Sequence, residues 1–197
     1  MRVILASKSP RRREILSMLG VRFDILSADA DESSQITDPR VLVRELALRK
    51  GRAARELLKA RGEWTDDTVI IASDTVVAIG EQILGKPKNE AHAAEMLRAL
   101  SGKGHCVISG VALLCGDREI ADHDETKVHF AEMSEREIDW YVKSSEPCDK
   151  AGAYAVQGLA SLWIKGLEGD YFNVVGLPVY RLNALCKSFL GKALTEL

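Results

Sequence analysis

The chain has 197 residues, of which 46% are hydrophobic, so it can bury one substantial core without a second domain. We expect a single domain over residues 1–197, or one domain with a small lobe. The formal net charge of −2 excludes a broad basic field for nucleic acid, so any anion site has to be local. The four cysteines form no C-x-x-C pair and no apolar run is long enough to span a membrane, which predicts a soluble cytoplasmic protein with reduced thiols.

The N-terminal part is expected to begin with a buried strand that turns directly into a helix. Residues 2–6 are short, apolar and rich in β-branched side chains, which is typical of a buried strand. Ser9 suits the N-cap of the next helix and Pro10 suits its first turn. Further along we expect a second strand at 22–28, an acidic loop, and a long helix over about 39–61.

The rest of the chain mixes strands and helices without a strict βα alternation. An apolar strand within residues 67–87 is expected to be interrupted at the polar stretch 73–75 and to turn back as a hairpin near Gly80. After it in the sequence we expect a helix over 89–102, two long strands over 105–116 and 118–133, and a short helix over 134–144. The remaining elements are a loop of small residues over 146–160, a hairpin over 161–176 and a closing helix over 177–190. This mixture predicts an α/β (α+β) fold with a central mixed β-sheet flanked by helices.

The turn between the first strand and helix has the composition of an anion site. Free backbone N–H groups and the helix dipole favour an anion there, and Ser7 and Ser9 add hydroxyl donors. The guanidinium groups of Arg11, Arg12 and Arg13 can bind phosphate in a bidentate manner. Alternatively, Ser9 simply caps the helix while the arginines cover its solvated face. The residues alone leave both interpretations open.

Two acidic residues are candidates for chemistry. Glu32 lies in an acidic loop after the second strand, and carboxylates near a phosphate site can hold Mg²⁺ together with phosphate oxygens. Asp74 ends an apolar run that carries its carboxylate into or beside the core, where such a group needs partners or a task. Each has a plainer explanation, because Glu32 can belong to a solvated loop and Asp74 can cap a turn between strands.

Three further residues can contribute to a ligand site. Lys50 lies on the long helix and Lys86 lies in the turn L-G-K-P, where either ammonium group could meet phosphate oxygens. A lone lysine is nevertheless more often a solvated surface residue. Gln157 lies in the loop of small residues, and its amide can donate to and accept from the edge of a base. The histidines have no metal-ligand spacing and are assigned no role.

Together these segments resemble the Maf family of nucleoside triphosphate pyrophosphatases along essentially the whole chain. The matching motifs are LASKSPRRREIL, DES, LALRK, ASDTVV, GKP followed by AHAAEMLRALSG, and EPCDKAGAYAVQG. The resemblance implies hydrolysis of a nucleoside triphosphate to the monophosphate and pyrophosphate, with Mg²⁺ or Mn²⁺ as cofactor. It also implies a strongly twisted mixed sheet similar to that of inosine triphosphate pyrophosphatases, and a homodimer.

The resemblance further implies a role for each candidate residue. Asp74 looks like the general base that activates water, and Glu32 and Asp74 look like the metal-site carboxylates. The implied phosphate-binding residues are Ser7, Arg11, Arg12, Lys50 and Lys86. Lys86 is also implied to be a catalytic group. Arg11, Thr75 and Gln157 are implied to select the base, as in the subgroup that acts on dTTP and UTP. We therefore expect Arg11 and Arg12 to face the nucleotide and Arg13 to face solvent. A nucleotide-binding regulator of cell division with incidental hydrolysis is the alternative.

Overall fold

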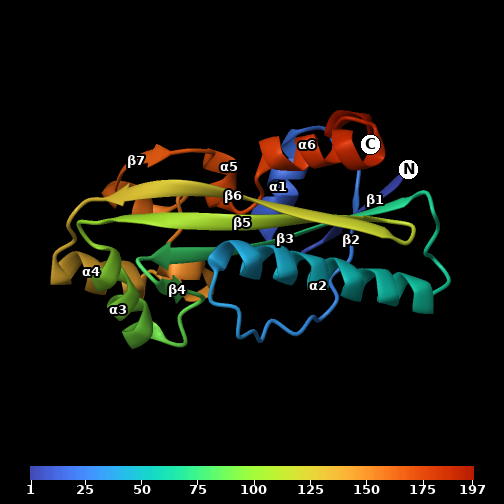
Figure 1. Ribbon diagram of the computed structural model, residues 1–197. Helices are drawn as coiled ribbons and strands as arrows, with labels where there is room; N and C mark the ends of the chain where they lie inside the picture. Colours follow the sequence, from blue (N-terminus) through green and yellow to red (C-terminus); the bar gives the residue numbers. More distant parts are fainter. The chain divides into compact units, whose positions relative to one another are not determined.

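The computed structural model describes residues 1–197, which form one seven-stranded sheet with helices beside it (Figure 1). The strands are β1 (Arg2–Ala6), β2 (Asp24–Ile25), β3 (Thr68–Ile79), β4 (Gln82–Leu84), β5 (Gly104–Cys115), β6 (Arg118–Phe130) and β7 (Ile164–Glu168). They are ordered β2-β1-β3-β5-β6-β7, and β4 pairs with β3. Strand β1 runs parallel to β2 and β3, whereas the pairs β3–β4 and β6–β7 are antiparallel. The sheet is therefore mixed, which confirms the predicted fold class.

The helices follow the predicted order, with one addition near the C-terminus. They are α1 (Pro10–Met18), α2 (Pro39–Ala60), α3 (Glu90–Leu100), α4 (Glu135–Lys143), α5 (Tyr171–Val175) and α6 (Val179–Leu190), with short 3₁₀ turns at Glu146–Asp149, Ala151–Ala153, Leu159–Trp163 and Leu194–Glu196. None of the helices combines the length and the apolar composition that a membrane span requires.

The chain divides into two compact units, each assembled from separated segments. The first consists of Met1–Asp74, Ser109–Asp124 and Gly176–Leu197, and the second of Thr75–Ile108 and Glu125–Val175. The division falls inside β3, β5 and β6, so each of these strands begins in one unit and ends in the other. The expectation of a single domain over 1–197 stays a prediction.

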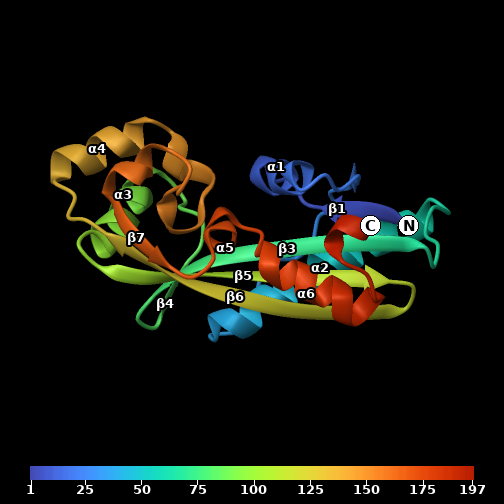
Figure 2. The ribbon, with the colours of Figure 1, turned by 90° about the horizontal axis from the view of Figure 1, so that it is seen from above.

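In the first unit, helices cover both faces of the sheet. Helix α2 lies on one face, and α1 and α6 lie on the other (Figures 1 and 2). Strand β1 pairs with β3 in register from Arg2 and Thr68 to Ala6 and Ala72, and nearly all of these residues are buried. A parallel strand that is covered on both faces has a continuous run of apolar residues, which explains why β1 and the part of β3 paired with it carry so few polar residues.

Gly110 of β5 marks a close approach between α2 and the sheet. A Cβ atom at this position would lie 2.3 Å from the backbone oxygen of Val43 and 2.8 Å from the backbone nitrogen of Arg44, both in α2. Because backbone atoms cannot swing aside as a side chain can, Gly110→Ala should lower the free energy of unfolding by ~1–3 kcal/mol. Gly166→Ala in β7 is the control, since its Cβ would meet nothing within 4 Å. Urea unfolding of both variants measures the difference, and equal midpoints would contradict the prediction.

The second unit has its own apolar core. Helices α3 and α4 pack there with residues from the loop over 146–163. The ring of Tyr154 lies 4.8 Å from that of Phe130, and its hydroxyl lies 2.7 Å from Nε2 of His105. Burial lowers the pKa of His105 to about 4, so this histidine is a neutral core residue at pH 7. The structure thus gives His105 a packing role and places it inside the core.

Two local predictions about strands near the site were wrong. The strand expected over 22–28 is limited to Asp24–Ile25, which pairs with β1. The interruption expected at 73–75 is absent, because β3 runs through it without a break. The polar side chains have partners outside the strand. Ser73 donates from Oγ to the backbone oxygen of Gly176 at 2.9 Å, and Asp74 pairs with Lys50. Satisfied polar groups need not end a strand.

The prediction of a hairpin over 161–176 was also wrong. Its first part is β7, which pairs antiparallel with β6. Its second part is α5, and the side chain of Asp170 accepts a hydrogen bond from the backbone N–H of Phe172 at 2.8 Å at the start of this helix. An aspartate that accepts from a backbone N–H in the first turn of a helix favours a helix start at that position. Here this preference outweighs the apolar composition, which favours a strand.

Candidate active site

The predicted site residues fall into both units. The first unit holds Ser7, Arg11, Arg12, Glu32, Lys50 and Asp74, and the second holds Thr75, Lys86 and Gln157. Within the first unit, the parallel pairing of β1 with β3 sets the site. Ala6 pairs with Ala72 in the last pair of this ladder, so Ser7 follows the carboxyl end of β1, and Asp74 lies two residues beyond that pair in β3, which continues to Ile79. The α/β proteins commonly bind their ligands beyond the carboxyl ends of their strands, which is the position of Ser7 after β1.

The turn after β1 is organised around the hydroxyl of Ser7. This oxygen accepts hydrogen bonds from the backbone N–H of Ser9 at 3.1 Å and from Nη1 of Arg12 at 3.3 Å. Nε of Arg12 donates to the backbone oxygen of Gly176 at 2.7 Å, and that same oxygen accepts from Ser73 of β3. Two neighbouring strands and α1 therefore share one polar cluster. The part played by the Gly176 carbonyl was not predicted.

The three consecutive arginines of α1 differ in exposure. Arg11 and Arg12 are half-buried, while Arg13 is exposed, as the resemblance led us to expect for a solvent-facing residue. Desolvation by burial lowers the pKa of Arg12, and the negative charge of Asp74 acts in the opposite direction. An arginine remains charged under such a shift, so Arg12 is a poorly hydrated cation beside a carboxylate. A group of this kind gains from contact with an anion.

Lys50 of α2 lies between two carboxylates. Its Nζ contacts Oδ1 of Asp74 and lies 2.9 Å from Oε1 of Glu32. The side chain of Asp74 is only 12% exposed, whereas that of Glu32 is 54% exposed. The structure thus brings together three predicted site residues from the acidic loop, from α2 and from β3. A nearly buried aspartate in contact with a flexible lysine has the position of a general base, because the lysine can turn to another anion and leave the carboxylate for a water molecule.

The carboxylates fit a divalent cation that is shared with a phosphate ligand. No group of three or more His, Cys, Asp or Glu side chains could hold a metal ion on its own. Glu32 and Asp74 nevertheless converge on one cationic group, the ammonium of Lys50. Mg²⁺ is usually bound through one or two carboxylates together with substrate phosphates and water. Two convergent carboxylates therefore suit such an ion once a triphosphate completes its ligands.

In the second unit, the segments that carry Lys86 and Gln157 are joined to each other. Gly152 donates from its backbone nitrogen to the backbone oxygen of Gly85 at 3.1 Å, which ties the loop before Gln157 to the turn of Lys86. Both side chains are exposed, and Thr75 lies on β3 at the start of this unit. The turn of Lys86 and the loop before Gln157 are therefore neighbours in the second unit.

The loop that carries Gln157 is anchored by Glu146, a residue that sequence reasoning missed. Its carboxylate accepts from the hydroxyl of Tyr141 at 2.8 Å and from the backbone N–H of Leu159 at 3.0 Å. A Cβ at Gly158 would lie 2.2 Å from the same carboxylate, so a larger residue there would require the Glu146 carboxylate to move. Glu146 is the first residue of the matching motif EPCDKAGAYAVQG, although no role was assigned to it.

The chain was then compared with known proteins. The family model described as Maf-like protein matches residues 2–189. The chain belongs to the Maf family. Curated relatives named dTTP/UTP pyrophosphatase in Bacillus cereus, Bacillus thuringiensis subsp. konkukian and Bacillus anthracis are each 43% identical over 189 residues, which is 95% of this chain and 95% of each relative. The resemblance stated from the motifs is thereby confirmed.

The Maf match extends over both units and includes every predicted site residue. Among solved structures, the Staphylococcus aureus Ham1 protein is similar over 67% of this chain and 73% of that chain, with a TM-score of 0.48 and 14% sequence identity. The fold class of this Maf protein follows from its own sheet order and strand directions.

Proposed function

We propose that this Maf protein is a nucleoside triphosphate pyrophosphatase that hydrolyses dTTP and UTP to the monophosphate and pyrophosphate. The observation that carries the proposal is the cluster in which Lys50 joins Asp74 to Glu32. It provides a nearly buried carboxylate and a mobile cation. The names of the curated relatives support the reaction and the pyrimidine substrates.

In the proposed mechanism, Asp74 is the general base. A bound triphosphate offers Lys50 phosphate oxygens as partners, and the ammonium then releases Oδ1 of Asp74 for a water molecule. The carboxylate takes a proton as the water oxygen forms a bond to the α-phosphorus, and the bond from that phosphorus to the oxygen bridging the α and β phosphates breaks, with pyrophosphate as the leaving group. Arg11 and Arg12 neutralise negative charge on the phosphates, which assists departure of pyrophosphate.

Glu32 and Asp74 are the residues that would hold Mg²⁺ or Mn²⁺ together with phosphate oxygens. When bound, such an ion neutralises charge that develops on the phosphates during bond cleavage. Ser7 contributes a hydroxyl donor to the same anion site, where it already accepts from the Arg12 guanidinium. Both carboxylates are assigned to the metal, and Asp74, which is the more buried of the two, is also assigned to the attacking water.

The residues of the second unit complete the proposal. Lys86 is assigned to the phosphates, while Thr75 and Gln157, with Arg11, are assigned to base selection. The amide of Gln157 can both donate and accept, which suits the edge of a pyrimidine. We further propose that both units act as one catalytic domain over residues 1–197. The homodimer and the cytoplasmic location stay predictions.

A panel of nucleotides tests the function directly. The purified protein is incubated with Mg²⁺ and each of the common ribonucleoside and deoxyribonucleoside triphosphates, and the products are separated by chromatography. We expect equimolar monophosphate and pyrophosphate, with kcat/KM highest for dTTP and UTP. Samples without Mg²⁺, with a chelator added, should lose activity. Binding of a triphosphate without turnover of any member of the panel would contradict the proposal and favour the nucleotide-binding regulator.

A further inference from the structure

The acidic loop that carries Glu32 has no buried residue. From Asp29 to Asp38 every residue is exposed except Ala30 and Ile36, which are half-buried. Two local turns shape the loop, because the side chain of Asp31 accepts from the backbone N–H of Ser33 at 2.8 Å and that of Ser34 accepts from Ile36 at 3.2 Å. Neither bond attaches the loop to the rest of the unit. Polar contacts have to hold it in place, since apolar burial does not.

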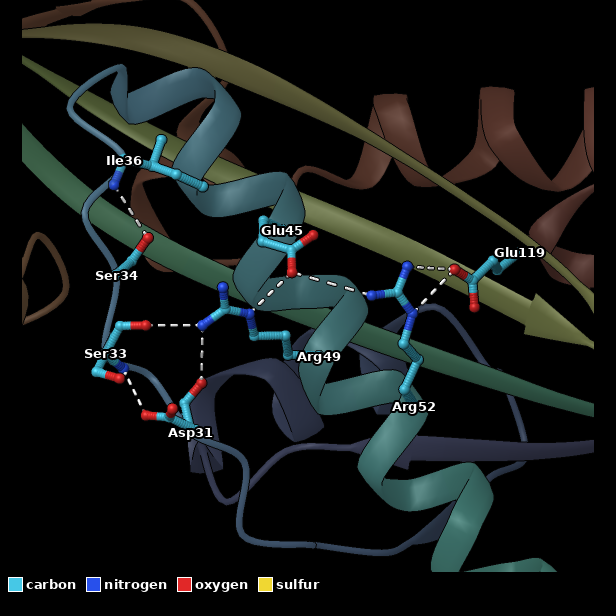
Figure 3. A network of polar contacts seen from close by, with 8 residues as sticks. All are labelled: Asp31, Ser33, Ser34, Ile36, Glu45, Arg49, Arg52 and Glu119. Carbon is cyan, nitrogen blue, oxygen red and sulfur yellow. Dashed lines mark hydrogen bonds and ion pairs between the residues drawn. The ribbon is translucent and has the colours of Figure 1, made fainter.

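Lys8 and Lys50 pair with the side chains of Asp29 and Glu32, and the backbone of the loop is attached to Arg49 of α2. Its Nη1 donates to the backbone oxygen of Ser33 at 2.7 Å and to the backbone oxygen of Asp31 at 3.3 Å. These two carbonyl groups belong to the residues on either side of Glu32, and Figure 3 shows the guanidinium of Arg49 directed at both. The contact is independent of the Glu32 side chain, so it acts on the position of the backbone.

The Arg49 guanidinium is itself oriented by its neighbours on α2. Its Nε donates to Oε1 of Glu45, one helical turn earlier, at 2.8 Å. The same carboxylate lies 3.9 Å from Nη1 of Arg52, which in turn donates from Nε to Glu119 of β6 at 2.9 Å (Figure 3). A side chain whose rotamer is fixed by a second hydrogen bond holds its partner more closely than a free one.

Consecutive residues of α2 therefore reach the loop at different points. Lys50 contacts the carboxylate of Glu32, and Arg49 contacts the backbone on both sides of it. We propose that Arg49 is a positioning residue, which fixes the loop so that the Glu32 carboxylate stays beside the Lys50 and Asp74 cluster. This inference rests on the proposed function for its catalytic consequence, although the positioning can be tested without it.

Hydrogen–deuterium exchange of the metal-free protein tests the positioning. Arg49→Gln removes the charged donor, and Arg98→Gln is the matched control, because Arg98 is also a helical arginine whose Nε donates to a glutamate, but it lies in the second unit. We expect amides over 29–37 to exchange ~10-fold faster or more in the Arg49 variant and at the wild-type rate in the control. Equal exchange in Arg49→Gln and wild type would overturn the proposal, whatever the activity.

The catalytic consequence is tested by coupling to Glu32. Arg49→Gln should lower kcat/KM by ~10- to 100-fold and raise the Mg²⁺ concentration needed for half-maximal rate, as loss of a residue behind a metal ligand does. Arg49→Lys, which keeps the charge and one donor group, should recover part of the loss. In a Glu32→Gln background, Arg49→Gln should lower kcat/KM only slightly further, because the effect of Arg49 depends on the Glu32 carboxylate. If the losses in kcat/KM from the two substitutions were additive, the proposal that Arg49 acts through Glu32 would be wrong.

The outcomes separate the two proposals. If no triphosphate is hydrolysed by the wild-type protein, the proposed function fails, and the exchange measurement still decides whether Arg49 holds the loop. If hydrolysis occurs and Arg49→Gln matches wild type in both exchange and kcat/KM, the positioning role fails alone.

Discussion

Asp74→Asn should lower kcat/KM for triphosphate hydrolysis by ~10²–10⁴-fold, which is the range that a positioned general base contributes. The amide keeps the size of the side chain but does not take a proton from water at neutral pH. The variant should remain folded, because Lys50 keeps Glu32 as a partner when Asp74 loses its charge. Steady-state kinetics across a Mg²⁺ series measures the loss, and far-UV circular dichroism verifies the fold.

Asp122→Asn provides the matched control for that experiment. Asp122 is also a partly buried aspartate of the first unit, and it pairs with Arg181 at 3.2 Å. The same substitution there should leave kcat/KM within about twofold of wild type, because the pair lies outside the described site. Full activity in Asp74→Asn would rule out this residue as the base. A loss of similar size in both variants would indicate a general structural effect.

Arg12→Ala should reduce both activity and stability, whereas Arg13→Ala should change neither by much. Arg12 donates to the Gly176 carbonyl and to the Ser7 hydroxyl, so its removal leaves these acceptors without that donor and costs ~1–3 kcal/mol in the free energy of unfolding. Loss of its charge beside the proposed phosphate site should lower kcat/KM by ~10²-fold or more. Arg13 is exposed, and its substitution should stay within ~0.5 kcal/mol.

Arg12→Lys separates the two contributions. Lysine keeps the positive charge but does not reproduce the fork that reaches Gly176 and Ser7 together. We expect most of the loss in kcat/KM to persist, because the planar fork positions the charge. Urea unfolding and kinetics on the same preparations measure both effects. A larger loss of activity at Arg13 than at Arg12 would show that the two arginines are assigned to the wrong sides of the helix.

The parts of the fold that could be predicted depend on short-range chemistry. Ser9 caps α1 with Pro10 in its first turn, and Asn89 accepts from the backbone N–H of His92 at 2.9 Å at the start of α3. Ser134 and Glu137 form the capping box expected at the start of α4. In each case the signal and its effect lie within four residues. Patterns of this range can be interpreted without knowledge of the tertiary structure.

The site could be predicted as a set of residues but not as a set of contacts. Asp74 and Lys50 were each singled out, and the Maf resemblance assigned their roles. The contact between them depends on how α2 lies against β3, which no local pattern specifies. The Gly176 carbonyl was missed because it lies 164 residues from Arg12 and acts through its backbone. Arg49 was missed for a similar reason, since it binds two backbone carbonyls that any residue type would provide.

The interleaving of the two units restricts how substrate preference can be engineered in this protein. The chain passes between the units after Asp74, Ile108, Asp124 and Val175, and the first three of these crossings lie inside β3, β5 and β6. A chimera that takes Thr75, Lys86 and Gln157 from a relative must therefore join the two parents within hydrogen-bonded strands. Such grafts have to keep strand register at the three junctions inside strands, because a slip of one residue turns each side chain to the opposite face. Point substitutions within the intact chain are thus the more practical route to altered base preference.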